Sequence, residues 1–455
     1  MTRLLTPRLE AVLLAVVTLV GLGLRLHDYG LAPAFVDNAD ELQFAWAGLN
    51  LIAHGDAISW SYFPAYPSAG VLHAYGQTYP LVHHWLDHPP GFSLLLGGYL
   101  WLIGQREMTH LTAEAVRLPA VLFATATVPL AHLVARRPLG APAALAGAVL
   151  LATGPGAVLL ARQAEPESVM APLFLAAVLL AGRLGQGRGG LAAGLALVAI
   201  CVLVPFFKVT GVAVGGVAVL ILAMNARWAW AMACGLGAAA GVGLYLLYGA
   251  LVDWNLLWLI IGEQAQNRRG VMAAFEFIAE PAGINRRLRD GWWLLGWIGA
   301  GVWLFHGRRS GAEQQLAWPL FAYAAVIAVL AGEELTAQYG WYRVIVLPFA
   351  YLAAGNLAWR TFVEPSPARL LAVLVLGGAM ATNYWLGDPT GTWIPDPLLI
   401  VGILAVVVAP AALVAVPALA FLRPWARSVA GLALALIVIG NVVTSLSLAA
   451  IYHRL

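Results

Sequence analysis

The sequence is poor in charged side chains and in cysteine. Only 10% of its 455 residues are Asp, Glu, Lys or Arg, and a single lysine, Lys208, stands among the arginines. The two cysteines, Cys201 and Cys234, both lie in apolar stretches, so a disulfide scaffold is not indicated. The formal net charge of +3 gives no indication of a nucleic-acid partner.

Long apolar runs make up most of the sequence. The chain is 61% hydrophobic and its mean hydropathy is +0.82, a composition that excludes a soluble domain. Each run of about 20 residues is long enough to cross the hydrocarbon core of a membrane. The pattern predicts an all-α polytopic membrane protein. Its expected spans are residues 10–26, 118–135, 139–161, 167–184, 189–207, 209–226, 228–250, 291–306, 315–331, 343–358, 368–385, 397–421 and 428–450.

One more apolar piece, residues 91–104, is short for a span and follows Pro89 and Pro90. If this piece does not cross, the basic groups of the short loops all fall on one side, as the positive-inside rule requires. We therefore predict an interfacial or re-entrant helix there, about thirteen spans in total, a cytoplasmic N-terminus and an outer C-terminus. The basic groups are Arg3/Arg8, Arg136/Arg137, Arg183/Arg188, Arg227, Arg308/Arg309, Arg360/Arg369 and Arg423/Arg427.

This topology places two larger loops on the outer face, residues 27–117 and 251–290, within one domain that covers residues 1–455. Short helices lying on the membrane surface are expected in both. Between His27 and Pro90 the first loop contains acids and histidines but no Lys or Arg. Further charges at the outer ends of spans are expected to form a ring with Asp40, Glu41, Asp87 and His88, because charges near lipid are costly unless paired or functional. They are Arg117, Arg162, Glu165, Glu167, Lys208, Glu333, Glu334 and Arg343.

Two adjacent acids, Asp40 and Glu41, follow the first span. Residues 38–41 match a capping box, in which Glu41 would reach back to the cap at Asn38. That pattern accounts for Glu41 but less well for Asp40. A carboxylate on the first turn of a surface helix can also act as a general base on an acceptor hydroxyl or amine, so both interpretations stay open.

A second acidic group, Glu165 and Glu167, follows Arg162 at a span boundary. A salt-bridged turn with Glu167 near the start of the next helix is the structural interpretation. Two acids within three residues exceed what such a turn needs, so a functional role stays open beside the structural one. Lys208 and Arg343 adjoin apolar helices, where they would either snorkel to the interface or bind phosphate.

The stretch from His83 to His88 is rich in histidine. His84 and His88 are four residues apart, a spacing that binds metal on a helix, and Asp87 lies between them. Pro89 and Pro90 argue against a regular helix there. These residues are candidates for a divalent metal site, although loop histidines without a ligand explain them too, and nothing in the sequence requires a metal.

The order and spacing of these pieces resemble the GT-C fold, within the group that includes protein O-mannosyltransferases and the aminoarabinose transferase of lipid A. The resemblance covers residues 10–185 well and the remainder by topology. The pieces that carry it are Asp40-Glu41, Asp87-His-Pro-Pro90, Arg117-Leu-Pro119, Arg162 with Glu167, and Tyr342-Arg343 with Pro348.

The resemblance implies an integral membrane glycosyltransferase. Such enzymes transfer a sugar from a polyprenyl-phosphate donor to an acceptor on the outer face, by a direct inverting displacement. It implies that Asp40 is the general base and that Glu41 supports the base or the acceptor. Glu167 would be the second acid, with Glu165 as its alternative.

The same resemblance places Asp87 and His88 at the donor phosphate, where the family often has an acid and a Lys. Because His88 replaces that Lys, phosphate binding is expected to shift to Lys208 or Arg343, with Arg117 and Arg162 as further candidates. Asp87 and Tyr342 are expected to contact the acceptor or support the site.

Two other classes of function are weighed against this one. A transporter or lipid flippase would carry ionisable groups at mid-membrane depth and related halves, whereas here the charges lie at span ends. An oligosaccharide ligase is the nearest alternative among enzymes. The acceptor, whether lipid, glycan or protein, is left open, and membrane lipids are expected partners. The Ala, Gly, Leu and Arg bias indicates a bacterial cytoplasmic membrane.

Overall fold

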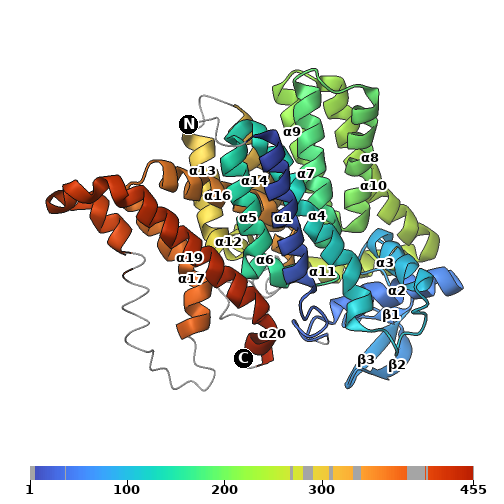
Figure 1. Cartoon of the computed structure of the whole chain (residues 1–455). Helices are drawn as coiled ribbons and strands as arrows, with labels where there is room; N and C mark the ends of the chain where they lie inside the picture. Colours follow the sequence, from blue (N-terminus) through green and yellow to red (C-terminus); the bar gives the residue numbers. More distant parts are fainter. Residues whose placement is uncertain are drawn as a thin grey trace.

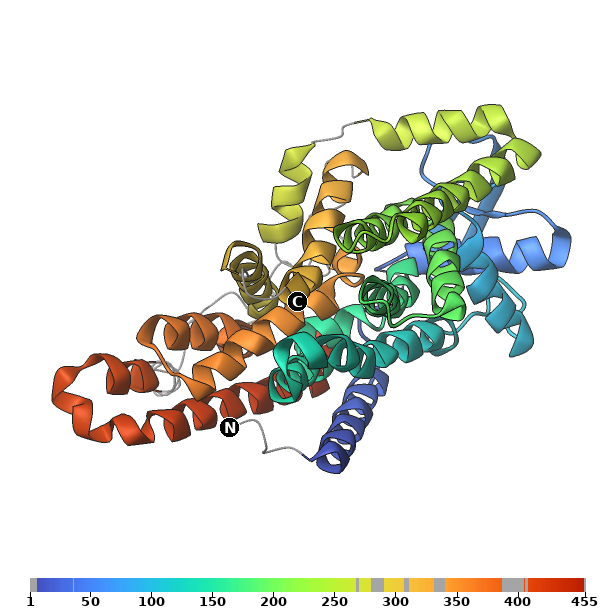
Figure 2. The ribbon, with the colours of Figure 1, turned by 90° about the horizontal axis from the view of Figure 1, so that it is seen from above.

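The computed structural model describes residues 6–35, 37–266, 270–279, 290–306, 311–330, 340–386, 405 and 408–453. Long helices stand side by side in one bundle, and the first loop forms a cap of short helices and strands at one end of it (Figure 1). Viewed from above, α17 and α19 lie on one side of the bundle and α8–α10 on the other (Figure 2). The helices between these two sides include α4, α5 and α7.

Six helices in the described ranges are long and apolar enough to cross a membrane. They are α1 (Pro7–Leu26), α4 (Ala113–Leu139), α7 (Pro166–Gly185), α10 (Trp228–Val252), α14 (Gly311–Leu330) and α19 (Ala426–Leu446). The other helices of the bundle are α5 (Ala141–Thr153), α6 (Pro155–Leu160), α8 (Leu191–Phe207), α9 (Val212–Met224), α13 (Gly291–His306), α16 (Leu347–Val363) and α17 (Pro367–Leu386).

The remaining helical pieces are short. They are α11 (Trp254–Ala265), α12 (Val271–Ala279), α20 (Leu448–His453), and the 3₁₀ turns η1 (Val209–Gly211), η2 (Gly340–Arg343) and η3 (Pro417–Trp425). The predicted multi-pass helical architecture is therefore confirmed, while the count of thirteen spans stays a prediction. The first part of the expected span at 397–421 falls outside the described residues, which include 405 and 408–421 of it. The expected span 139–161 is interrupted at Gly154, because Pro155 lacks the N–H that would continue the helix.

The first loop contains a small sheet that the all-α prediction missed. Strands β1 (Ser59–Trp60), β2 (Ser68–Ala74) and β3 (Gln77–Val82) pair antiparallel in the order β1-β3-β2. Tyr75 and Gly76 between β2 and β3 both have positive φ, 53° and 74°, as a tight hairpin turn requires. The strands are short, mostly exposed and interrupted by Pro80, so their apolar pattern gives little signal.

Two short helices, α2 (Asp40–His54) and α3 (Gly91–Leu102), complete this loop and pack on each other. They approach so closely that a Cβ on Gly48 would lie 1.9 Å from the carbonyl oxygen of Ser93, and one on Gly97 would lie 2.3 Å from Gly48. The 12 residues of α3 rise about 18 Å, less than the ~30 Å hydrocarbon core. Its length therefore suits the interfacial or re-entrant helix predicted for this segment.

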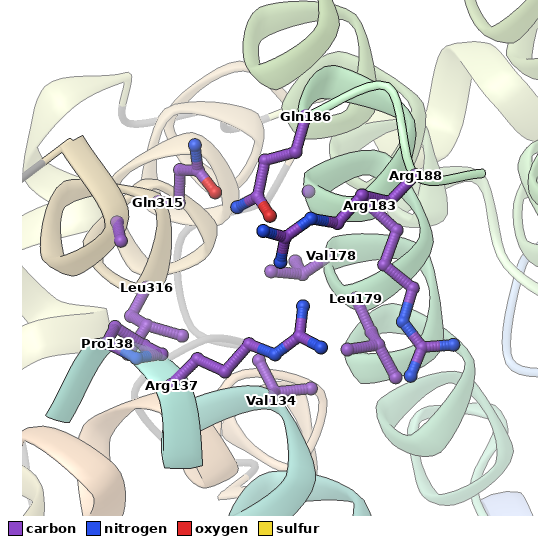
Figure 3. Close-up of a pocket in the computed structure, with 12 residues that line it drawn as sticks. Val134, Arg137, Pro138, Val178, Leu179, Arg183, Gln186, Arg188, Gln315 and Leu316 are labelled. Atoms are coloured by element: carbon purple, nitrogen blue, oxygen red, sulfur yellow. The ribbon is translucent and has the colours of Figure 1, made fainter. Parts of the chain in front are cut away.

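A cavity of about 360 Å³ lies at the opposite end of the bundle from this loop, between the ends of α4, α7 and α14. Arg137, Arg183 and Arg188 line it together with Gln186 (Figure 3). Arg117 and Arg137 belong to opposite ends of α4, so this cavity is separate from the acidic cap. The basic groups 136/137 and 183/188 thus meet at one end, as the charge pattern predicts.

Candidate active site

The acids and the lysine singled out in the sequence meet where several helix ends converge beneath the first loop. Asp40 begins α2, Glu165 and Glu167 lie at the start of α7, and Lys208 ends α8. Tyr342 comes from η2, far along the chain. Because each of these side chains sits at the end of a helix, their charges lie at the boundary of the bundle rather than along its length.

Lys208 is the centre of this cluster. Its Nζ donates to Oε1 of Glu167 at 2.6 Å and lies 4.2 Å from the centre of the Tyr342 ring. Only 4% of the residue is exposed. Burial alone would lower the pKa of Lys208. The neighbouring Glu167, Tyr342 and Glu165 raise the pKa by more than burial lowers it, so the net shift is upward and the Lys208 side chain stays protonated.

Asp40 faces Lys208 without a hydrogen bond from any of the described residues. Burial raises the pKa of Asp40 to about 6, an effect that the positive charge of Lys208 opposes and that Glu167 and Glu41 reinforce. Such a carboxylate is ionised at neutral pH, yet it is more basic than an ordinary aspartate. It therefore has the properties of a general base.

Glu165 and Glu167 each have one carboxylate oxygen engaged and one without a hydrogen-bond partner among the described residues. Oε1 of Glu165 accepts from Nδ2 of Asn38 at 2.8 Å. Burial, followed by the charge of Asp40, raises the pKa of Glu165 well above its usual value. Glu165 is therefore harder to ionise than an ordinary glutamate, whereas Glu167 is the acid paired with Lys208.

Glu41 is not the end of a capping box. The N-cap of α2 is Ala39, and no side chain caps it. Glu41 instead points away from its own helix start and binds the guanidinium of Arg117, with three N···O distances of 2.8–3.0 Å, and the N–H of Ala164 at 2.8 Å. Both charged side chains are 0% exposed. The capping interpretation of Glu41 is wrong because a buried arginine from α4 competes for it, and Asn38 is taken by Glu165.

Arg117 and Arg162 are engaged with the protein interior. Arg117 also donates to the carbonyl oxygens of Tyr29 and Pro33, and Arg162 donates to those of Leu24 and Ala32. The salt-bridged turn expected after Arg162 is not formed, since its guanidinium holds carbonyl groups at the end of α1 and in the first loop. These contacts fix the loop that carries Asp40. They engage every guanidinium nitrogen of Arg117, whereas Nε of Arg162 has no hydrogen-bond partner among the described residues.

Asp87 and His88 border the same cluster, between β3 and α3. Asp87 accepts from the hydroxyl of Tyr66 at 2.7 Å, and its backbone oxygen accepts from Gln264 of α11 at 2.7 Å. Burial raises the pKa of Asp87 to about 7, against the effect of the hydrogen bond from Tyr66. No pattern in the sequence indicates Tyr66, a loop tyrosine that reaches Asp87 only through the tertiary fold.

His88 is a neutral side chain in this setting. Burial and then the charge of Lys208 lower its pKa to about 3. Its ring stacks on Phe44 of α2, with 5.2 Å between ring centroids. An uncharged imidazole can donate one hydrogen bond to a phosphate but supplies no positive charge, so His88 does not replace the expected Lys electrostatically.

Arg343 lies apart from Lys208, although Tyr342 precedes it directly in the chain. Its guanidinium is 5.2 Å from the centre of the Trp293 ring, and its charge acts on Asp290. Asp290 accepts from the hydroxyl of Tyr351 at 2.6 Å. The described contacts of the two cations differ, since Lys208 contacts Tyr342 and Arg343 contacts Trp293, and the single ring of charges stays a prediction. Glu333 and Glu334 lie outside the described residues.

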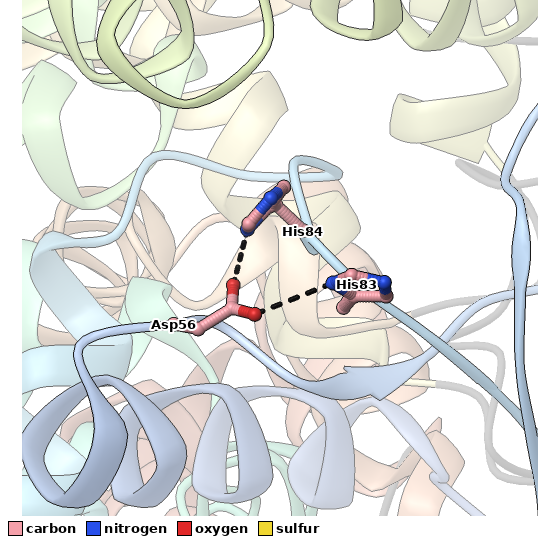
Figure 4. Close-up of side chains that lie close together, drawn as sticks. All are labelled: Asp56, His83 and His84. Atoms are coloured by element: carbon pink, nitrogen blue, oxygen red, sulfur yellow. Dashed lines mark hydrogen bonds and ion pairs between the residues drawn. The ribbon is translucent and has the colours of Figure 1, made fainter.

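The predicted metal ligands do not come together as one set. His88 stacks on Phe44 and Asp87 binds Tyr66, while His84 turns to Asp56. No helix forms between His84 and His88, so their i, i+4 spacing does not place the two rings on one helix face. Figure 4 shows the grouping that is present instead, Asp56 with His83 and His84.

Three helix N-termini add their own electrostatics to the cluster. The N-caps of α2, α3 and α7 are Ala39, Pro90 and Glu165, and none of them caps its helix through a side chain. Amide groups of a first turn and the helix dipole attract anions. Together with Lys208 they make a site suited to a phosphate beside a free carboxylate base.

Comparisons with known proteins identify the fold. A model of the dolichyl-phosphate-mannose-protein mannosyltransferase family matches residues 87–248. ArnT from Cupriavidus metallidurans bound to undecaprenyl phosphate is similar in structure, with a TM-score of 0.54, 17% identity, and 99% of this chain and 78% of ArnT covered.

Arabinosyltransferase EmbB from Mycobacterium smegmatis has a TM-score of 0.59 at 18% identity, covering 99% of this chain and 42% of EmbB. The chain has the fold of the GT-C glycosyltransferases. The resemblance predicted from the sequence is thereby confirmed.

A third GT-C structure widens the comparison. The archaeal oligosaccharyltransferase AglB from Archaeoglobus fulgidus, in complex with an inhibitory peptide and a dolichol-phosphate, has a TM-score of 0.51 at 13% identity and covers 85% of this chain and 56% of its own. The curated protein sequences give no match. The family-model match contains Asp87, Glu167 and Lys208, whereas Asp40 and Tyr342 lie outside the matched residues.

Proposed function

We propose that this GT-C protein is an integral membrane glycosyltransferase that moves a sugar from a polyprenyl-phosphate donor to an acceptor on the outer face of the membrane. One observation supports the proposal above all: the buried Lys208, held by Glu167 at 2.6 Å, lies beside an Asp40 carboxylate to which no described residue donates a hydrogen bond. A phosphate needs the first group, and an acceptor hydroxyl or amine needs the second.

In the proposed reaction Asp40 takes the proton of the acceptor as the acceptor atom attacks the anomeric carbon. The bond from that carbon to the phosphate oxygen breaks, and its electron pair stays on the polyprenyl phosphate. A single displacement inverts the anomeric centre. An Asp40 pKa of about 6 suits the base, because it is ionised near pH 7 while still basic enough to accept a proton.

Lys208 stabilises the leaving phosphate. An ammonium has three N–H donors, and Glu167 takes one of them. Glu167 therefore positions Lys208 in this proposal and is not itself the base. Burial raises the pKa of Glu165 and so disfavours its charged form, which reduces the repulsion that an incoming phosphate would meet. His88 can add one neutral hydrogen bond.

The roles of the other predicted residues follow from their contacts. Glu41, Arg117 and Arg162 position the loop that carries Asp40, because their polar groups are engaged with each other or with carbonyl groups. Asp87 is held by Tyr66 near the donor. Arg343 is proposed to bind a second part of the donor or acceptor next to Asp290.

The donor class is supported by the ArnT structure, which contains undecaprenyl phosphate, and by the family whose model matches. A lipid-linked donor also suits a site at the boundary of the bundle, where a polyprenyl tail can lie among the helices. We place the protein in a bacterial cytoplasmic membrane, with the basic end of the bundle cytoplasmic and the first loop outside.

A transporter or flippase and an oligosaccharide ligase are the alternatives. The charged cluster lies at helix ends rather than at mid-membrane depth, which disfavours a transporter. A ligase that transfers whole oligosaccharides shares the fold, as the AglB comparison illustrates. An oligosaccharide ligase and the proposed monosaccharide transferase are distinguished by the size of the glycan that is transferred.

The test is a transfer assay in detergent with a panel of polyprenyl-phosphate monosaccharides, in which release of polyprenyl phosphate is measured. The wild type is expected to release it, and Asp40→Asn to lose at least about a hundredfold of the rate. Asp253→Asn is the matched control, because Asp253 caps α11 in the second outer loop and asparagine caps equally well. Equal release by wild type and Asp40→Asn would refute Asp40 as the base. No release from any donor by folded protein would refute the proposed donor class.

A further inference from the structure

A second group of ionisable side chains lies on the first loop, outside the Lys208 cluster. Asp56 follows the end of α2, and His83 and His84 follow β3 directly. The β1–β3 pairing brings them together, since Ser59 is opposite Val82. The three side chains are partly open to solvent, with exposed fractions of 27%, 47% and 38%.

Both imidazole rings face one carboxylate. Nδ1 of His83 is 3.3 Å from one oxygen of Asp56, and Nδ1 of His84 forms a hydrogen bond with the other oxygen (Figure 4). One ligating atom from each residue can be chosen so that all three lie within 4.8 Å of one another. Ligand atoms around a tetrahedral zinc ion lie about 3.4 Å apart, given bonds of roughly 2.1 Å. Small side-chain rotations are therefore enough to surround an ion.

The backbone holds this group in place. His83 and His84 lie between the β1–β3 pairing and a hydrogen bond in which the N–H of Trp85 donates to the carbonyl oxygen of Ala57 at 2.7 Å. Asp56 directly precedes Ala57, so this backbone clamp positions all three side chains. A site built on such a clamp needs little ordering when the ion binds.

We propose that Asp56, His83 and His84 bind a divalent transition-metal ion, with zinc as the expected ion. Two imidazole nitrogens disfavour Mg²⁺ and Ca²⁺, which take oxygen ligands. Three protein ligands with a solvent-facing side leave one position for water. The ion would join the end of α2, which begins at Asp40, to the segment that leads into Asp87. The proposal concerns binding, and it does not rest on the proposed reaction.

The alternative is that the histidines only donate hydrogen bonds to Asp56 and bind no ion. A direct binding experiment separates the two. Full-length protein without a polyhistidine tag is stripped with a chelator, dialysed, and titrated with Co²⁺ while the visible absorption of the Co²⁺ site is recorded. Zn²⁺ is then added to displace the Co²⁺.

The wild type is expected to bind one equivalent and to exchange it for Zn²⁺. His84→Ala and the isosteric Asp56→Asn should each weaken binding by at least about 10–100-fold, since even loss of an outer contact to a metal ligand costs that much. His73→Ala is the matched control, because His73 lies exposed on β2 of the same loop and bonds Thr78 instead. Its affinity should equal that of the wild type.

A second readout guards against a variant that simply misfolds. Zn²⁺ should raise the unfolding temperature of the wild type and of His73→Ala, but not that of Asp56→Asn. Absence of Co²⁺ and Zn²⁺ binding at micromolar concentration by the wild type would overturn the proposal. Equal affinity of wild type, Asp56→Asn and His84→Ala would overturn it as well. Neither result depends on a sugar donor, so the proposed transferase activity is judged separately.

Discussion

The buried pair of Glu41 and Arg117 is expected to hold the candidate active site together. Arg117→Met removes three N–H···O contacts to Glu41 and two to the carbonyl oxygens of Tyr29 and Pro33. The Glu41 carboxylate would then keep only the N–H of Ala164 while remaining fully buried. An uncompensated buried charge is costly, so this variant tests whether the pair fixes the loop that leads to Asp40.

The expected magnitude follows from burial. Breaking a buried ion pair by removing one partner costs about 3–5 kcal/mol, and the two lost carbonyl contacts favour the upper end. An unfolding entropy of about 2.1 cal/mol/K per residue gives a shift of about 3–5 °C in Tm for 455 residues. Glu41→Gln added to Arg117→Met removes the orphaned charge, so the double variant should recover part of the loss.

The assay is thermal unfolding in detergent, followed by tryptophan fluorescence. Arg360→Met is the matched control, because Arg360 forms an ion pair with Glu313 at 3.0 Å but is 46% exposed. Such a surface pair contributes about 0–1 kcal/mol, so its Tm should move by about 1 °C or less. Equal Tm values for Arg117→Met and Arg360→Met would refute the role of the buried pair.

Three further predictions concern the site itself. The pKa of Asp40 is raised to about 6 and its ionised form is the proposed base, so kcat/KM should fall about tenfold per pH unit below 6. A rate that is constant from pH 5 to pH 8 would contradict this. Lys208→Met should lower kcat by a factor of about 10²–10³, because the leaving phosphate loses its stabilising charge. Lys208→Arg keeps the charge and should retain more activity. Equal rates for the two variants would argue against a cationic role. Gly91→Ala should lower the Tm and the folded yield, because its Cβ would lie 2.6 Å from the carbonyl oxygen of Phe206. Gly98→Ala, whose nearest neighbour would be 3.9 Å away, should fold normally in the same size-exclusion assay, and equal yields would refute the packing argument.

Much of the bundle could be predicted from the sequence because a membrane imposes a simple rule on it. Backbone polar groups in lipid must be satisfied within each helix, so apolar length alone locates α1, α4, α7 and α10. The sheet β1-β3-β2 could not be located in this way. It lies outside the apolar runs, and its pairing depends on contacts between residues up to 23 positions apart, such as Ser59 with Val82.

The same distinction between sequence and tertiary structure applies to the candidate site. The sequence by itself determined which side chains are available: a single lysine, few acids, and their positions at the ends of apolar runs, because a charge at any other depth is costly. Only the tertiary structure decided their partners, since hydrogen bonds and ion pairs require atoms to meet within about 3 Å. It joined Glu41 to Arg117, 76 positions away, and Glu167 to Lys208, 41 positions away, and it left the carboxylate of Asp40 available as a base.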